Sequence, residues 1–89
     1  MREKVIKRLL LESVDLIYDK DDRKRFIKIR RVLVDIPNMT FNKLFIKNKN
    51  YDFYKGFCYA RSIRRVLSDI EYDICLGVID NIKTGYYGG

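Results

Sequence analysis

One eight-residue phrase occurs twice in this chain, as IRRVLVDI at residues 29–36 and as IRRVLSDI at residues 63–70. In both copies the apolar residues fall at positions i, i+3, i+4 and i+7, which is the spacing of one face of an α-helix. The pattern predicts two amphipathic helices whose arginines lie away from the buried side. We expect Leu33 and Leu67 to be equivalent core residues at the centres of these helices.

The first half of the chain predicts a pair of antiparallel helices. Residues 2–19 have helical periodicity without glycine or proline, and the periodicity resumes at residues 23–36 after an aspartate-rich turn. Asp21 or Asp22 is expected to cap the second helix, because an aspartate side chain accepts hydrogen bonds from the N–H groups of the first turn. Pro37 marks its end, since proline disfavours helical geometry in the residue before it.

The second half of the chain predicts either two further helices or one long helix. A third helix is expected from Asp52 to Leu67, because apolar residues recur there at helical spacing. The run from Ser68 to Glu71 matches a capping box, which predicts a fourth helix that starts there and stops at residues 84–85. The alternative is that the third helix continues without a break.

Residues 37–50 fit two interpretations. Thr40 is able to cap a short helix that runs through Ile46, or the chain forms a strand hairpin at residues 44–54. The predicted fold class is therefore all-α, a compact bundle of three to four short helices. The alternative is a small α+β domain that contains the hairpin.

We expect a single helical domain at residues 1–85, because 89 residues supply one modest hydrophobic core. Residues 86–89 are expected to form a flexible C-terminal tail. The tail ends in Gly88 and Gly89, as ubiquitin-like and sulfur-carrier proteins do. Those proteins open with a β-hairpin, whereas this chain opens with a predicted helix.

The residue types exclude some kinds of chemistry. There is no histidine, and Cys58 and Cys75 are the only cysteines, so one chain cannot form a four-ligand zinc site of the usual cysteine and histidine types. We expect both cysteines to be reduced core thiols. No converging set of catalytic groups is visible, so we expect neither an enzyme nor a cofactor. The apolar runs are too short for a signal peptide or a membrane span, which predicts a cytoplasmic protein without a membrane partner.

Positive charge is concentrated in the first 70 residues. They carry 18 of the 19 lysines and arginines but only 9 of the 12 acidic residues, and the whole chain has a net charge of +7. This balance favours anionic partners. We expect an acidic protein surface or a complex of nucleic acid with protein, and direct binding of nucleic acid is the alternative.

A face rich in arginine is predicted on the second and third helices. Projection of the third helix places one tyrosine and three arginines on the side away from its apolar stripe. Arginine binds phosphates and carboxylates through paired hydrogen bonds, and tyrosine stacks on flat groups. The alternative is that Arg31 pairs with Asp35, and Arg65 with Asp69, as solvated surface pairs. The candidate partner-binding residues are Tyr54, Arg61, Arg64, Arg65, Arg23, Arg30 and Arg31.

The aromatic residues between Tyr51 and Tyr59 are too many for one buried stripe. Phe53 and Tyr59 are expected to flank the core side of the third helix, while Tyr54 and Phe57 point elsewhere. A contiguous exposed aromatic patch is typical of a binding surface. We therefore expect either another helix over these side chains or an interface, for which a homodimer is one candidate.

In size, basic charge and composition the chain resembles the small accessory proteins of phages and mobile elements in low-GC bacteria. Lys, Ile, Asn, Tyr and Phe are abundant, as AT-rich coding DNA favours. The resemblance implies an inhibitor or adaptor that binds and blocks host nucleic-acid machinery, in the manner of anti-CRISPR and other anti-defence proteins. Two alternatives stay open: a regulator that binds nucleic acid directly, and a helical bundle like the bacteriocin immunity proteins.

Overall fold

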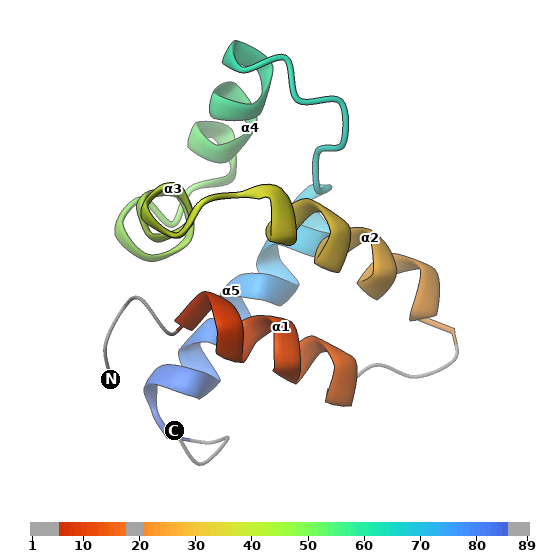
Figure 1. Ribbon diagram of the computed structural model, residues 1–89. Helices are drawn as coiled ribbons and strands as arrows, with labels where there is room; N and C mark the ends of the chain where they lie inside the picture. The colour runs from red at the N-terminus through yellow and green to blue at the C-terminus, as the bar shows by residue number, and fades with distance from the viewer. Residues whose placement is uncertain (1–5, 18–20, 86–89) are drawn as a thin grey trace.

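Six helical segments make up most of the chain that the structure describes. The structure, a computed structural model, describes residues 6–17 and 21–85, without the side chains of residues 15–17. No strand occurs in these ranges, so the all-α prediction is confirmed and the hairpin at residues 44–54 is wrong. The segments are α1 (Ile6–Ile17), α2 (Arg23–Asp35), α3 (Asn38–Asn42), the π-helical turn η2 (Lys43–Lys47), α4 (Tyr51–Ala60) and α5 (Asp69–Lys83) (Figure 1).

The helices are arranged about two layers deep. The Cα atoms extend over 36 × 31 × 18 Å, and the shortest dimension is close to two helix diameters of about 10 Å each. α1 packs against both α2 and α5, while α4 lies at the opposite end of the molecule from α1 (Figure 1). The hydrophobic core is therefore shared by helices from both halves of the sequence.

α1 and α2 form the predicted antiparallel pair, and two basic side chains join them. Near the start of α1, the Lys7 ammonium donates a hydrogen bond to the carbonyl of Ile36, just beyond the end of α2. Toward the other end of the pair, Arg30 donates to the carbonyl of Leu11 at 3.1 Å. A cation at a helix C-terminus satisfies carbonyls that lack a partner in the helix. The relative position of the two helices is thus held at two points.

The first copy of the octapeptide forms the C-terminal half of α2, as predicted. Asp22 occupies the N-cap position of this helix, but its side chain makes no capping hydrogen bond and forms an ion pair with Arg25 at 3.2 Å. Asp22 therefore occupies the predicted N-cap position, but the predicted capping hydrogen bond is not formed. The four apolar residues of the first copy are all buried, namely Ile29, Val32, Leu33 and Ile36.

Residues 38–47 of the stretch at 37–50 are helical, which confirms the first of its two interpretations. The helix begins at Asn38 directly after Pro37, so the expected cap at Thr40 is wrong. Phe41 and Phe45 lie one turn apart on the buried side, with ring centroids 4.8 Å apart and nearly parallel planes. These two rings begin an aromatic cluster in the core that also includes Tyr51, Tyr54 and Tyr72.

α4 ends at Ala60, seven residues before the predicted end of the third helix. Asn50 caps its start by accepting a hydrogen bond from the N–H of Phe53 at 3.1 Å. The chain leaves the helical path at Ser62, whose φ of 55° lies in the left-handed region that non-glycine residues seldom adopt. The second copy of the octapeptide is consequently not a helix until its last two residues.

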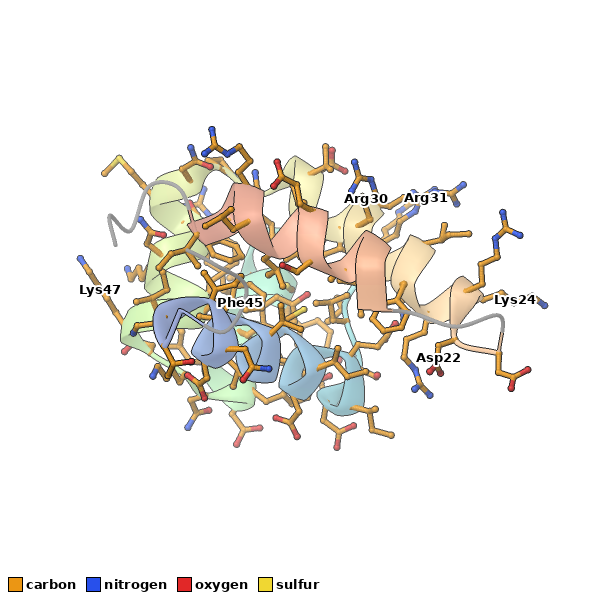
Figure 2. All side chains as sticks on the ribbon, turned by 90° about the horizontal axis from the view of Figure 1, so that it is seen from below. Asp22, Lys24, Arg30, Arg31, Phe45 and Lys47 are labelled. Atoms are coloured by element: carbon orange, nitrogen blue, oxygen red, sulfur yellow. The ribbon has the colours of Figure 1, made fainter. Side chains whose placement is uncertain are left out.

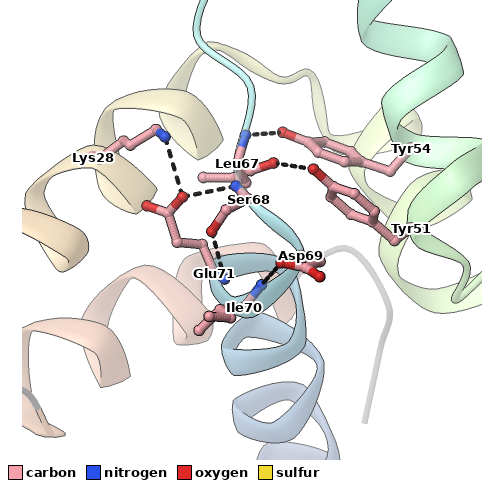
Figure 3. A network of polar contacts seen from close by, with 8 residues as sticks. All are labelled: Lys28, Tyr51, Tyr54, Leu67, Ser68, Asp69, Ile70 and Glu71. Atoms are coloured by element: carbon pink, nitrogen blue, oxygen red, sulfur yellow. Dashed lines mark hydrogen bonds and ion pairs between the residues drawn. The ribbon is translucent and has the colours of Figure 1, made fainter.

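Two tyrosines of α4 hold the second copy by its backbone (Figure 3). The hydroxyl of Tyr51 donates to the carbonyl of Leu67 at 2.9 Å, and the hydroxyl of Tyr54 accepts from the N–H of the same residue at 3.0 Å. Leu67 is fully buried although it lies outside a helix. Its predicted place in the core is therefore confirmed, and its predicted helical conformation is wrong.

The predicted capping box is present and starts α5. Ser68 accepts a hydrogen bond from the N–H of Glu71 at 3.2 Å, and Glu71 accepts one from the N–H of Ser68 at 2.7 Å. The fourth helix is therefore confirmed, and the alternative of a continuous third helix is wrong. α5 stops as predicted, because Thr84 is its C-cap and Gly85 follows with a φ of 81°. The predicted tail at residues 86–89 lies outside the described residues.

Candidate partner-binding groove

Tyr54 belongs to the aromatic core and not to the surface. Its side chain is 0% exposed and lies between the rings of Phe45 and Tyr72, with centroids 5.6 and 5.0 Å away. Burial raises the pKa of the Tyr54 hydroxyl far above its ordinary value. The expectation that this tyrosine stacks on a partner beside the arginines is therefore wrong.

The arginines assigned to the third helix are separated because α4 ends before them. Arg61 lies in the turn after α4, with its guanidinium over the ring of Phe57 at 5.6 Å. Arg64 and Arg65 lie in the non-helical segment at residues 63–68, and both are exposed. The structure brings only Arg65 beside the arginines of α2.

A shallow basic groove lies between α2 and Arg65. It consists of two overlapping depressions of about 500 and 510 Å³. Figure 2 shows Arg30 and Arg31 projecting together from α2, with Lys24 nearer the start of the helix. Arg23 and Arg64 are exposed but are not among the lining residues. The basic groove is lined by Lys24, Ile27, Lys28, Arg30, Arg31, Val34, Asp35 and Arg65.

The centre of the basic groove is a mixed stripe along α2. Ile27, Arg30, Arg31 and Val34 follow the spacing i, i+3, i+4 and i+7, so they share one face of the helix. Ile27 is 42% exposed and Val34 is 55% exposed. Apolar side chains at both ends of a basic stripe suit contact with a protein surface that is partly apolar and partly acidic.

Most cations of the groove are not neutralised by the described part of the chain. Lys28 forms an ion pair with Glu71 at 3.1 Å, and Arg30 donates to a backbone carbonyl of α1. No ion pair joins Arg31 to Asp35 or Arg65 to Asp69 within the described residues, so these two expected pairs are not formed. Arg31 and Arg65 therefore present their guanidinium groups to solvent.

A smaller and more enclosed pocket continues from the basic groove. Asp35 and Arg65 line both cavities, and the walls of the smaller one are otherwise apolar or sulfur-containing. Its volume is about 210 Å³. We call it the Cys58 pocket; it is lined by Val32, Asp35, Ile36, Cys58, Ile63 and Arg65. A further open depression follows and ends at Phe57 and Arg61.

Both cysteines are buried and form no disulfide, as predicted. Burial raises the pKa of the Cys58 thiol, and it raises the pKa of the Cys75 thiol to about 12. Both thiols are therefore protonated and weakly nucleophilic at neutral pH. Within residues 6–17 and 21–85, no group of three or more cysteine or acidic residues is placed to hold a metal ion.

The aromatic side chains of α4 have the opposite orientation to the expected one. Phe53 and Tyr59 are exposed, Phe57 is half-buried, and Tyr54 is buried. Tyr59 lies against the Lys55 ammonium, which is 5.7 Å from its ring centroid. A homodimer through the outer side of α4 stays a prediction.

Two apolar members of the groove were missed from the sequence. Ile27 and Val34 lie seven residues apart on α2, away from the stripe of the octapeptide, and this spacing is visible in the sequence. The signal for them is a pair of apolar residues at helical spacing on the otherwise polar face of a helix. The Cys58 pocket has no comparable pattern, because its walls come from three separate segments.

Comparison with protein-family models, curated proteins and solved structures finds no match for this chain. None of the described helices combines the length and the hydrophobicity that a membrane-spanning helix needs.

Proposed function

We propose that the chain is a non-enzymatic binding protein whose basic groove holds an acidic surface of another protein. The mixed stripe on α2 carries this proposal. Arg30 and Arg31 lie between the exposed Ile27 and Val34, and Arg65 lines the same depression. Arginine is enriched in protein interfaces because its guanidinium binds carboxylates through paired hydrogen bonds while its flat face packs on apolar groups.

The apolar part of the groove favours a protein over a nucleic acid. Proteins that bind single strands stack bases on aromatic side chains among cations. Here the side chains beside the arginines are aliphatic, and the tyrosine expected among them is buried. Aliphatic groups contribute to binding chiefly by removing apolar partner surface from water.

The mode of action that we propose is occlusion. A protein without catalytic chemistry acts on its target by covering a surface that the target needs. The resemblance in size, charge and composition adds the class of target that we propose, namely nucleic-acid machinery of a bacterial host. An inhibitor or adaptor of the anti-defence type fits both features.

A capture experiment with matched variants tests the proposal. The tagged protein is exposed to an extract of the source cell with and without nuclease, and the captured partner is then titrated. Arg31→Glu/Arg65→Glu reverses two charges in the groove. Arg23→Glu/Arg64→Glu reverses two exposed arginines outside it, one on α2 and one in the same non-helical segment. Both variants lower the net charge equally, so they separate the groove from bulk charge.

We expect the groove variant to weaken binding at least about tenfold, which corresponds to about 1.4 kcal/mol. The control variant should stay within about threefold of the parent protein, since rim charges have small effects on affinity. Capture that survives nuclease and is unaffected by the groove variant would refute the proposal. Capture that disappears with nuclease would favour the regulator that binds nucleic acid directly.

A further inference from the structure

The Cys58 pocket is a place for one apolar side chain beside the basic groove. Val32 and Ile36 contribute the α2 wall, Cys58 the α4 wall, and Ile63 the remaining side. The charged groups that line it are Asp35 and Arg65, which it shares with the basic groove. Its volume of about 210 Å³ is ample for a leucine or phenylalanine side chain.

We propose that the partner binds through a short acidic segment that places one large apolar anchor residue in the Cys58 pocket and carboxylates on Arg31 and Arg65. This inference rests on the proposed function and names the chemistry of the partner. Protein interfaces commonly derive most of their affinity from a few anchors that fill desolvated pockets and are surrounded by charged contacts. An apolar pocket continuous with an arginine groove is complementary to such a segment.

The dimensions of the stripe on α2 favour a helical segment. Ile27 and Val34 are seven residues apart, which is about 10 Å along a helix axis. A partner helix of two to three turns covers this length and presents residues at i, i+3 and i+4 to one side. Its apolar residues then contact Ile27 and Val34 at the two ends, and its carboxylates lie opposite the arginines between them.

Asp35 determines on which side of the groove the acidic residues of the partner bind. Among the described residues it is the only acidic one that lines the basic groove, and it also lines the Cys58 pocket. A carboxylate of the partner beside Asp35 is repelled, whereas one beside Arg31 is attracted. The anchor residue, which is uncharged, is therefore the group that passes Asp35.

A random library of 12-residue peptides displayed on phage, selected against the full chain, tests this inference. We expect the selected peptides to combine at least two Asp or Glu residues with one Leu, Ile, Met, Phe or Trp at helical spacing. Selected peptides without acidic residues, or without an apolar anchor, would overturn it. A 20-base-pair DNA duplex is titrated in parallel; if the duplex binds through Arg31 and Arg65 and no peptide is selected, the inference fails.

Variants of the pocket then test the anchor with a synthetic peptide from the selection. Ile63→Trp fills the pocket from its half-buried wall, and we expect at least about tenfold weaker binding, as for loss of a hot-spot contact. Ile63→Phe is the milder variant if the larger ring disturbs folding. Ile70→Trp is the control, because Ile70 is exposed and does not line the pocket; it should change affinity less than about twofold.

Asp35→Asn supplies a test that does not depend on filling the core. Removal of this exposed carboxylate should tighten peptide binding by about two- to fivefold, since one repulsive contact of a few tenths to one kcal/mol is lost. Unchanged or weaker binding would contradict the placement of the carboxylates. If Ile63→Trp captures the natural partner as well as the parent does, the anchor is refuted while the proposed function still stands.

Discussion

The two copies of the octapeptide bury the same central residue in different backbone conformations. Leu33 and Leu67 are both 0% exposed. The first copy is the end of a regular helix, whereas the second is non-helical from residue 63 to residue 68 and then enters α5. The same sequence therefore buries its central leucine in two ways, because the side chain reaches the core from a helical and from a non-helical backbone.

The one position at which the copies differ explains the start of α5. Val34 of the first copy corresponds to Ser68 of the second, and three residues later Pro37 corresponds to Glu71. Ser68 and Glu71 together form the capping box, while Val34 and Pro37 cannot. A helix therefore begins at the place in the second copy where a helix is ending in the first.

The residues before each copy explain the rest of the difference in backbone conformation. α2 is already helical when it reaches the first copy, so the phrase only continues it. α4 has ended at Ala60 when the chain reaches the second copy, and Tyr51 and Tyr54 of that helix bond the backbone of Leu67. A helix through Leu67 would use the same N–H and carbonyl groups internally.

The largest expected effect tests whether the two leucines are equivalent. Leu33→Ala and Leu67→Ala should each lower the free energy of unfolding by about 2 to 4 kcal/mol, through lost burial and the cavity that remains. Urea unfolding followed by circular dichroism measures both. A cost below about 0.5 kcal/mol at Leu67, the range of surface substitutions, would show that the second copy does not need its core contact.

The second prediction concerns Glu71, whose position after the first copy is occupied by Pro37. Burial by itself would raise the pKa of this carboxyl, but hydrogen bonds from Ser68 and the neighbouring Lys28 charge outweigh it, so the pKa lies below its ordinary value of 4.5. Glu71→Ala should cost about 2 kcal/mol at neutral pH, because a buried charge-assisted hydrogen bond and a cap are lost.

The same group predicts a dependence on pH. Since folding lowers the pKa of Glu71, its stabilising contribution is complete above about pH 4.5 and is lost as the pH falls through the pKa of the folded state. Urea midpoints of the parent and of Glu71→Gln should converge as the pH falls through this range. Midpoints that differ by a constant amount from pH 7 to pH 3 would contradict this prediction.

The sequence predicts the buried residues of this fold better than its helix ends. Apolar periodicity and the capping box correctly predicted the helices that contain residues 29–35 and 69–83, because both depend on neighbours along the chain. The end of α4 is accompanied by two hydrogen bonds to distant backbone: Tyr51 donates to the carbonyl of Leu67, 16 residues away, and Tyr54 accepts from its N–H, 13 residues away. No glycine or proline marks the break.

The candidate groove likewise contains some features that the sequence predicts and others that depend on distant contacts. Arg30 and Arg31 were predicted because a helix projection places them on the face that lines the groove, whereas Arg23, predicted with them, lies outside it. Arg65 was also predicted, but its separation from Arg61 and Arg64 follows from the end of α4 and the bend at Ser62, which periodicity does not predict. The burial of Tyr54 depends on the aromatic rings of other helices that pack around it. The Cys58 pocket is formed by residues of α2, α4 and the non-helical segment. These residues are far apart in the sequence, so no sequence pattern predicts the pocket.

An exchange of the residue at which the two copies differ tests the role of the N-cap. Ser68→Val makes the second copy identical to the first and should cost about 1 to 2 kcal/mol, because the N-cap of α5 is removed. The reciprocal change, Val34→Ser, alters an exposed residue and should cost no more than about 0.5 kcal/mol. Thermal melts of the two variants provide the measurement; equal losses would mean that the cap does not distinguish the copies.

The smallest expected effect lies at the bend that separates α4 from the second copy. Ser62 has a φ of 55°, and glycine adopts this conformation without steric cost. Ser62→Gly should therefore stabilise the fold by up to about 1 kcal/mol, while Ser62→Ala should not stabilise it. Stabilisation by alanine instead of glycine, seen in urea midpoints, would indicate that the helical path competes at this position.

The two buried thiols make local opening of the molecule observable. Cys58 lies beside the second copy, where Ile63 shares its pocket, whereas Cys75 belongs to the middle of α5. A thiol-reactive reagent modifies either one only while its surroundings are transiently open. Labelling rates at the two sites therefore report separately on release of the non-helical segment and on opening of the α5 core. Faster modification of Cys58 would mean that this segment detaches while the rest of the fold stays closed.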